Sequence, residues 1–385
     1  MIERLINYLS NKTFISIGLA FFILSVEFSF WITRLPDVKV SLGLSELDLG
    51  VALFFLPLGA IISMLLSGRL INKIGEGKTT IYATLFYSFV VFCPFLAFDF
   101  YSVCLALFIL GFAMGWLDIA MNSVAGTIEK QHQVSIMSTS HGFFSLGGMI
   151  GAALGGLLAA AKVDIFLHLG ITFIIVMVVL FGFMDRYIGN VKQMNSDEKP
   201  PLFAIPVKPV YGIAIIAFCI MIGEGAIADW SAIYLRDFIG SSAYVSGFGY
   251  AAFSLTMTLG RFNGDFYVDK YGRLLILITG ASIALIGLLL LLATNSIIVI
   301  LGFSLVGLGY SCIVPVIFSS AAKVKGLAPA HGIASVASAG YFGFLIGPVI
   351  IGIIAEYQGL NMAFMLLFGL TLISLFSAKK ALKSN

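Results

Sequence analysis

The chain has 385 residues, of which 60% are hydrophobic and only 11% are charged, and its mean hydropathy is +1.06. Because soluble proteins carry about 25% charged residues, this composition excludes an ordinary soluble domain and is typical of a polytopic membrane protein. The formal net charge of +3 is too small and too scattered for a protein that binds nucleic acid.

A membrane-spanning helix needs about 20 mostly apolar residues, and runs of this kind predict an all-α membrane protein with twelve spans. The expected spans, in chain order, are residues 13–33, 48–70, 78–98, 101–126, 134–160, 164–185, 208–235, 243–264, 274–293, 296–320, 331–355 and 361–378. A polar linker, residues 186–208, separates the sixth span from the seventh. We therefore expect two six-helix bundles, residues 1–185 and residues 209–385.

The basic residues indicate how the chain is oriented in the membrane. With a cytoplasmic N-terminus, seventeen of the 22 lysines and arginines fall on the cytoplasmic side and four on the opposite side. Because cytoplasmic loops carry the excess of basic residues, both termini are predicted to be cytoplasmic. We expect a multi-pass protein of the plasma membrane, the inner membrane in a bacterium.

The two halves of the chain echo each other at an offset of 196 to 199 residues. The matching features are the turns NKIGEGK (72–78) and DKYGR (269–273), the glycine pairs Gly147/Gly151 and Gly343/Gly347, and the tryptophans Trp31 and Trp230. A near-constant offset of half the chain indicates internal duplication. Two pseudo-symmetric six-helix halves are typical of a transporter whose site lies at their interface near the bilayer midplane.

The turn after the second span, Gly68-x-x-x-Asn72-Lys73-Ile74-Gly75, resembles the cytoplasmic motif of the major facilitator superfamily, G-x-x-x-D-[RK]-x-G-[RK], with Asn72 in place of the acid. The second copy keeps its charges as Asp269-Lys270-Tyr271-Gly272-Arg273, and Asp265 stands where the leading glycine would be. The resemblance covers essentially the whole chain, and it implies a gating role for Asn72, Lys73, Asp265, Asp269, Lys270 and Arg273. Arg261, four residues before Asp265, is expected to pair with it as a further gate element.

Four segments give a finer resemblance to the rhizopine-permease-like branch of this superfamily, which is related to fucose–proton symporters. They are FWITRLPDV (30–38), GWLDIAMNS (115–123), STSHGFFSLGGMIGA (138–152) and EGAIADWSAIYLRD (224–237). Asp118 and Asn122 match the acid-x-x-x-Asn pattern of those symporters. The resemblance also implies that spans one, four, seven and ten line a central cavity, which puts Glu27, Asp118 and Glu224 on three of its helices.

Asp118 is the sharpest functional candidate, because a charged aspartate at the centre of a spanning helix costs about 2.5–3.5 kcal/mol and usually faces a pathway. Asn122 follows at i+4 on the same helix face. We expect Asp118 to carry a coupling proton, with Glu27 or Glu224 as the second acid and His141 as a relay that changes charge near neutral pH. A structural hydrogen bond for Asp118, and a neutral interhelical one for His141, are the alternatives.

The side chains expected to contact the solute are aromatic, amide or charged groups near these acids: Asn122, Trp31, Arg34, Asp229, Trp230 and Tyr310. Indole rings stack on sugar rings, and amides and acids bind hydroxyl groups. Trp31 and Arg34 also approach the outer end of the first span, where anchoring at the membrane interface would explain them equally well. For Asp229 the alternative is a gate contact with Arg236.

The sequence therefore predicts a secondary active transporter that moves a small polar organic solute, similar to a sugar or polyol, by proton-coupled symport and alternating access. We expect the solute, protons and the lipid bilayer as partners, a monomeric state, and neither a cofactor nor a metal. An enzyme is not indicated, because the chain has no H-E-x-x-H or G-x-S-x-G pattern.

A proton-driven efflux antiporter for drugs or metabolites is the alternative. Gly147-x-x-x-Gly151-Ala152-x-x-Gly155-Gly156 resembles the span-five motif of proton-driven exporters, although Ala152 replaces their proline. Close packing of helices is the simpler explanation of such glycines. The direction of transport is left open by the sequence.

Overall fold

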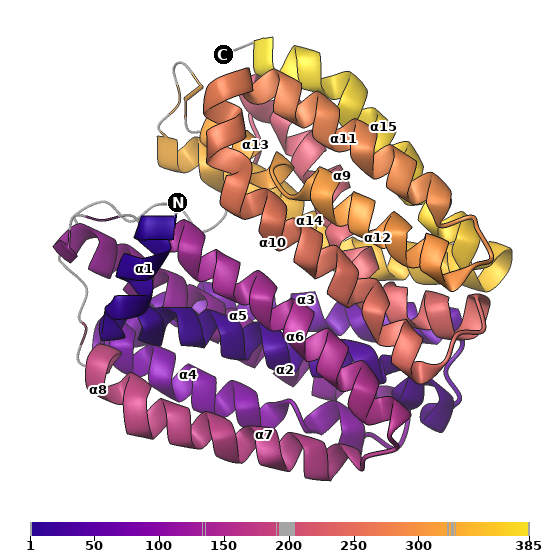
Figure 1. Ribbon diagram of the computed structural model, residues 1–385, viewed down its shortest axis with the longest axis horizontal. Helices are drawn as coiled ribbons and strands as arrows, with labels where there is room; N and C mark the ends of the chain where they lie inside the picture. Colours follow the sequence, from indigo (N-terminus) through magenta and orange to yellow (C-terminus); the bar gives the residue numbers. More distant parts are fainter. Residues whose placement is uncertain are drawn as a thin grey trace. The chain divides into compact units, whose positions relative to one another are not determined.

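The computed structural model describes residues 2–132, 134, 136–189, 191, 205–321, 323–324, 327 and 329–383. The regular secondary structure of these residues is all helical (Figure 1). The longer helices are α2 (Lys12–Leu42), α3 (Glu46–Ile74), α4 (Glu76–Val90), α5 (Phe100–His132), α6 (Met137–Ala160), α7 (Ile165–Val179), α9 (Tyr211–Ile233), α10 (Ala243–Tyr271), α11 (Arg273–Leu290), α12 (Ser296–Tyr310), α14 (Pro329–Gln358) and α15 (Leu360–Lys383). The shorter ones are α1 (Ile2–Ser10), α8 (Asp185–Ile188), α13 (Ile313–Ala321) and the turns η1 (Cys93–Leu96), η2 (Leu180–Met184), η3 (Lys208–Val210) and η4 (Tyr234–Phe238).

Eleven helical segments of the described chain are long and apolar enough to cross a membrane, so the chain is a multi-pass membrane protein. Each corresponds to one of the expected spans. The expected eighth span, residues 243–264, is not among them. It lies in α10, which has ample length but is rich in glycine, serine and threonine and carries Arg261 and Lys270 toward its end.

The chain forms two compact units. Unit 1 comprises residues 1–42 and 55–197, and unit 2 comprises residues 43–54 and 198–385. Unit 2 includes residues 43–54 because the start of α3 packs on α14, where a Cβ on Gly50 would lie 2.6 Å from the Pro348 carbonyl oxygen. The Leu47 backbone N–H also donates to Glu356 Oε2 at 3.2 Å.

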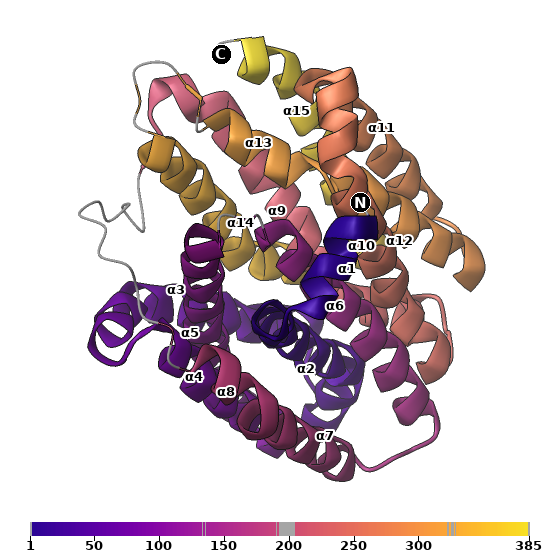
Figure 2. The ribbon, with the colours of Figure 1, turned by 60° about the vertical axis from the view of Figure 1, so that its left-hand side comes forward.

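In unit 1, α2 and α6 lie side by side, as Figures 1 and 2 show. Glycines line the face of α6 that meets α2. A Cβ on Gly147 would lie 2.5 Å from the Phe22 carbonyl oxygen, and one on Gly151 would lie 2.6 Å from that of Val26. Only glycine lets the two backbones approach this closely.

Unit 2 repeats this contact between α9 and α14. A Cβ on Gly343 would lie 2.7 Å from the Phe218 carbonyl oxygen, so both members of the contact lie 196 residues after their counterparts in unit 1. The packing register thus shows the internal duplication directly. It also corrects one sequence match, because at this offset the counterpart of Trp31 is Ile227 rather than Trp230.

Candidate functional site

In unit 1 the structure brings Asp118 and Asn122 together on α5. The Asn122 side-chain amide donates to the Asp118 backbone carbonyl at 2.8 Å and to Asp118 Oδ1 at 3.2 Å. Both side chains are half-buried. The Asp118 carboxylate therefore has an amide donor beside it, on a residue that is only partly buried.

A second acid, Glu76, lies against the same stretch of α5. Its residue is only 1% exposed, and the hydroxyl of Ser123, the neighbour of Asn122, donates to Glu76 Oε1. The other oxygen, Oε2, has no hydrogen-bond partner among the described residues. Glu76 is not predicted as a site residue because it stands in a glycine-rich turn, where acidic residues are usually solvated. One signal could have found it: Glu76 occupies the last position of the turn motif, where the superfamily has a basic residue.

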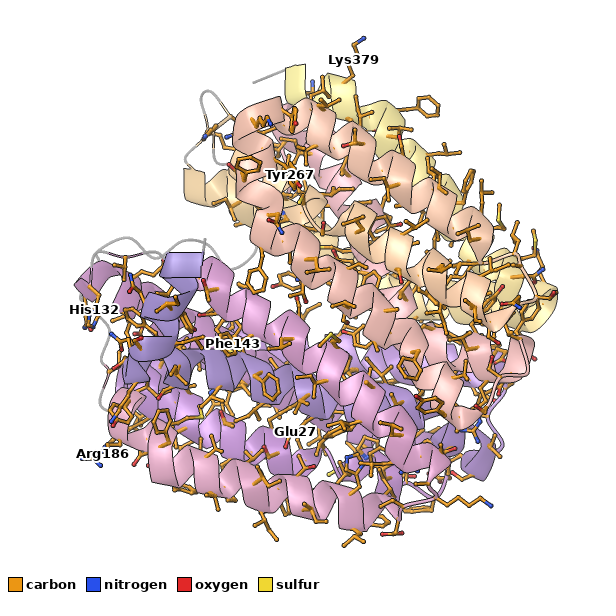
Figure 3. All side chains as sticks on the ribbon, viewed as in Figure 1. Glu27, His132, Phe143, Arg186, Tyr267 and Lys379 are labelled. Carbon is orange, nitrogen blue, oxygen red and sulfur yellow. The ribbon has the colours of Figure 1, made fainter. Side chains whose placement is uncertain are left out.

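Glu27, the other expected acid of unit 1, is 1% exposed on α2 (Figure 3). Ser88 on α4 donates its hydroxyl to Glu27 Oε2 at 3.0 Å. This hydrogen bond turns the carboxylate toward α4, and no contact described by the structure joins it to Asp118. His141 lies on α6 with its ring packed edge-on against Phe21 of α2, 4.9 Å between centroids.

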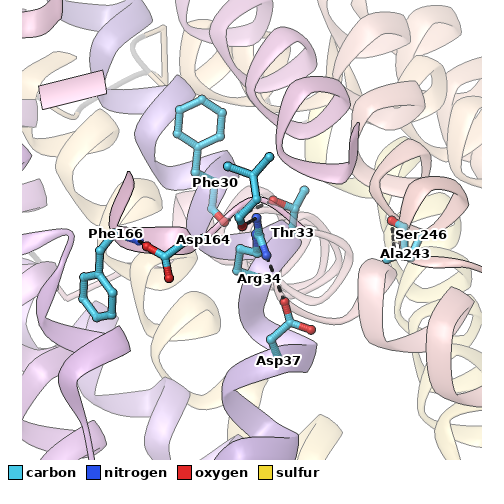
Figure 4. A network of polar contacts seen from close by, with 9 residues as sticks. Phe30, Thr33, Arg34, Asp37, Asp164, Phe166, Ala243 and Ser246 are labelled. Atoms are coloured by element: carbon cyan, nitrogen blue, oxygen red, sulfur yellow. Dashed lines mark hydrogen bonds and ion pairs between the residues drawn. The ribbon is translucent and has the colours of Figure 1, made fainter. Parts of the chain in front are cut away.

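Arg34 and Trp31 occupy the far end of α2. Arg34 Nη2 donates at 2.9 Å to the carbonyl of Val163 in the turn between α6 and α7, and Nη1 lies 3.5 Å from Asp37 (Figure 4). Trp31 is fully buried and packs against Phe95. These contacts join α2 to its neighbours, and the two side chains are buried within unit 1 rather than turned to lipid.

Unit 2 has its own buried charges, from α9 and α10. Arg261 Nη2 lies 3.7 Å from Glu224 Oε2, and the two side chains are 23% and 16% exposed. Tyr250 is close enough to interact electrostatically with Glu224, Arg261 and Asp229. Arg261, expected to pair with Asp265 as a gate element, thus faces an acid on another helix; the Asp265 side chain lies outside the described part of the chain.

The aromatic candidates of unit 2 are deeply buried. The Tyr310 hydroxyl shares a 2.6 Å hydrogen bond with Thr371, and its ring lies against Gly223, one residue before Glu224. Trp230 is 0% exposed. Tyr310 therefore supports the helix that carries Glu224.

The expected gate residues are only partly described. The side chains of Asn72, Asp265 and Asp269 lie outside the described part of the chain, and Lys73 is exposed. The Lys270 ammonium lies 5.1 Å from the centre of the Tyr271 ring.

Arg273 makes a contact that mirrors one in unit 1. Its Nη2 donates to the Ser319 hydroxyl at 3.2 Å, just as Ser123 meets Glu76. Each pair joins the first residue of a helix to a serine on the next span, and each of those helices follows a glycine with positive φ, 90° at Gly75 and 79° at Gly272. The two halves thus share one contact but carry opposite charges in it.

The chain belongs to the major facilitator superfamily, whose family model matches residues 14–328 and 213–382. It is 34% identical over 362 residues to an uncharacterised MFS-type transporter of Yersinia pestis, covering 91% of each chain. It is 30% identical over 364 residues to the membrane protein MosC of Rhizobium meliloti, covering 94% of this chain and 88% of MosC.

Two solved structures show the same fold at low sequence identity. A point mutant of the nucleoside transporter NupG gives a TM-score of 0.76 at 14% identity, covering 96% of this chain and all of NupG. A bacterial homologue of the human lysosomal transporter Spinster, inward-facing and occupied, gives 0.69 at 13% identity, covering 96% of each chain.

Proposed function

We propose that this membrane transporter moves a small polar organic solute, similar to a sugar or polyol, together with protons by alternating access. The transporter has twelve spans, with α10 as the eighth, in two bundles formed by residues 1–185 and 209–385. Both termini are cytoplasmic, and the membrane is a bacterial inner membrane. In unit 1, Asp118 carries the coupling proton and Asn122 contacts the solute. In unit 2, the Glu224–Arg261 pair is the candidate solute contact.

The observation that carries the proposal is the hydrogen bond from the Asn122 amide to the half-buried Asp118 carboxylate. A carboxyl group inside a spanning helix is costly and usually lines a transport pathway. The Asn122 amide stabilises the ionised form of Asp118. A proton or a solute hydroxyl can take the place of the amide as the partner of the carboxylate. Loading and release of the proton can therefore change how the site binds a solute.

The glycine motif of the fifth span does not favour efflux over uptake, because close packing of helices explains its glycines. Gly147 and Gly151 touch the α2 backbone, and the same contact recurs in unit 2 at Gly343. A motif that both halves need for helix packing does not distinguish an exporter. We therefore propose that solute and proton move in the same direction. The flux assay below tests this against proton–solute antiport.

A solute screen and a flux assay test the proposal. Sugars, polyols and nucleosides are screened on the purified full-length protein by thermal shift. The best ligand is then added to proteoliposomes that contain a pH-sensitive dye. Symport predicts that solute influx acidifies the lumen, whereas solute flux without a dye response would contradict proton coupling, and a proton gradient that drives uptake into inside-out vesicles would show efflux.

A further inference from the structure

The N-terminal helix α1 precedes the first span and carries an apolar stripe. Ile2, Leu5, Ile6 and Leu9 follow one another at the i, i+3, i+4, i+7 spacing of one helix face. Ile6 is 55% exposed and Leu9 48% exposed, so this stripe is not covered by unit 1 where its side chains are described. Asn7, also exposed, provides a polar position away from the stripe.

The side of α1 that meets unit 1 is marked by Tyr8, which is 3% exposed. Its hydroxyl shares a 2.8 Å hydrogen bond with Ser140 on α6, and its ring stacks on Phe143 with 5.5 Å between centroids. A Cβ on Gly18 would lie 2.9 Å from the Tyr8 hydroxyl, so glycine leaves the space that the tyrosine fills. Because two residues turn an α-helix by about 200°, Ile6 lies on the side opposite to Tyr8.

The short connection between α1 and α2 fixes where the C-terminal end of α1 lies. Asn11 alone separates α1 from α2, and its side-chain oxygen caps α2 by accepting the backbone N–H groups of Thr13 at 2.9 Å and Phe14 at 3.3 Å. One residue reaches at most about 3.6 Å. The C-terminal end of α1 therefore lies next to the start of α2, the helix of the first expected span.

We propose that α1 lies in the lipid interface, with Ile6 and Leu9 inserted among the acyl chains and Tyr8 holding it to α6. An amphipathic helix next to a bilayer gains stability by placing its apolar face in the boundary between headgroups and chains. Lys12, the first residue of α2, is exposed next to this segment, so its ammonium group suits anionic headgroups. Through Ser140, the helix would set the position of α6 next to His141.

Spin labels test this placement directly. Cysteine is introduced by Ile6→Cys or Leu9→Cys on the stripe and by Asn7→Cys as the matched polar control, in a variant without the four native cysteines. The labelled full-length protein is placed in nanodiscs of phosphatidylethanolamine and phosphatidylglycerol. Labels on the stripe should collide with dissolved oxygen several-fold more than with a water-soluble nickel chelate, and the label at position 7 should show the reverse.

Equal nickel accessibility at all three positions would overturn the proposal. Stripe labels shielded from both reagents would overturn it as well, because these labels would then contact protein. Trypsin digestion of the protein with its native cysteines provides a second readout. Cleavage at Arg4 and Lys12 should be slow in wild type and in Asn7→Ala/Ser10→Ala, but several-fold faster in Ile6→Ser/Leu9→Ser. Identical cleavage of all three proteins would also contradict a lipid-bound α1.

Discussion

At the level of single residues, two acids in apolar helices of unit 1 have different surroundings. Glu27 is 1% exposed and bonded by Ser88, whereas Asp118 is half-buried and shares its carboxylate with the Asn122 amide. A group that exchanges protons and contacts a solute needs access to water. Asp118 meets this requirement, and Glu27 is better placed to hold α2 against α4.

The charge pair of unit 2 gives a residue-level test of solute binding. Arg261→Gln removes the guanidinium that faces Glu224, so a solute bound there loses a charged partner and the acid loses its counter-charge. We expect the affinity measured by thermal shift or calorimetry to fall at least about tenfold, which is about 1.4 kcal/mol.

Arg261→Lys keeps the charge but not the planar fork of donors, so it should bind the solute more tightly than Arg261→Gln. Wild-type affinity in Arg261→Gln would remove this pair from the site.

At the level of helices, glycines let α6 approach the backbone of α2 closely, because glycine has no side chain. Gly147→Ala would place a methyl group 2.5 Å from a backbone oxygen of α2, so the helices must move apart. Overpacking of this kind costs about 1–3 kcal/mol, and the thermal unfolding temperature in detergent should fall.

Gly170→Ala is the matched control on α7, because no atom lies within 4 Å of its added methyl group. This substitution should be neutral or slightly stabilising, since alanine favours a helix. Equal loss of stability in the two variants would show that the α2–α6 contact is not as tight as described.

The positions of helices could be predicted because a bilayer demands long apolar segments, and the Asp118–Asn122 contact could be predicted because its members are one turn apart. The contact of Ser123 with Glu76 could not, since it joins two helices and residues 47 apart. The same holds for Glu224 and Arg261. The expected eighth span, residues 243–264, lies within α10, but its glycines, serines and threonines make it less apolar than the other spans.

At the level of the whole molecule, the duplication is a repeat of contacts more than of residue types. The α2–α6 register recurs 196 residues later, and the Glu76–Ser123 contact recurs as Arg273–Ser319 with the opposite charge. Selection for one packing arrangement can preserve the register while each half changes its charges. The turn before α4 therefore precedes an acid, Glu76, and the turn before α11 precedes a base, Arg273.

The duplicated contact predicts unequal effects of the same mutation. Ser123→Ala leaves the buried Glu76 carboxylate without a donor, which costs about 1–3 kcal/mol. Ser319→Ala leaves the more exposed Arg273 free to bind water, so its effect should stay within about 0.5 kcal/mol. Thermal unfolding of the two variants side by side measures the difference, and a larger loss in Ser319→Ala would contradict it.

Proton coupling through Asp118 is the central claim, and the Asp118→Asn variant tests it most directly in proteoliposomes. Asp99→Asn is the control, because Asp99 is an exposed acid whose pKa is kept below its usual range by hydrogen bonds from Ser102. Uphill uptake driven by a proton gradient and downhill exchange of the same solute are measured for each protein. We expect Asp118→Asn to lose uphill uptake while it retains exchange, and Asp99→Asn to keep both. Full proton-driven accumulation by Asp118→Asn would contradict the account.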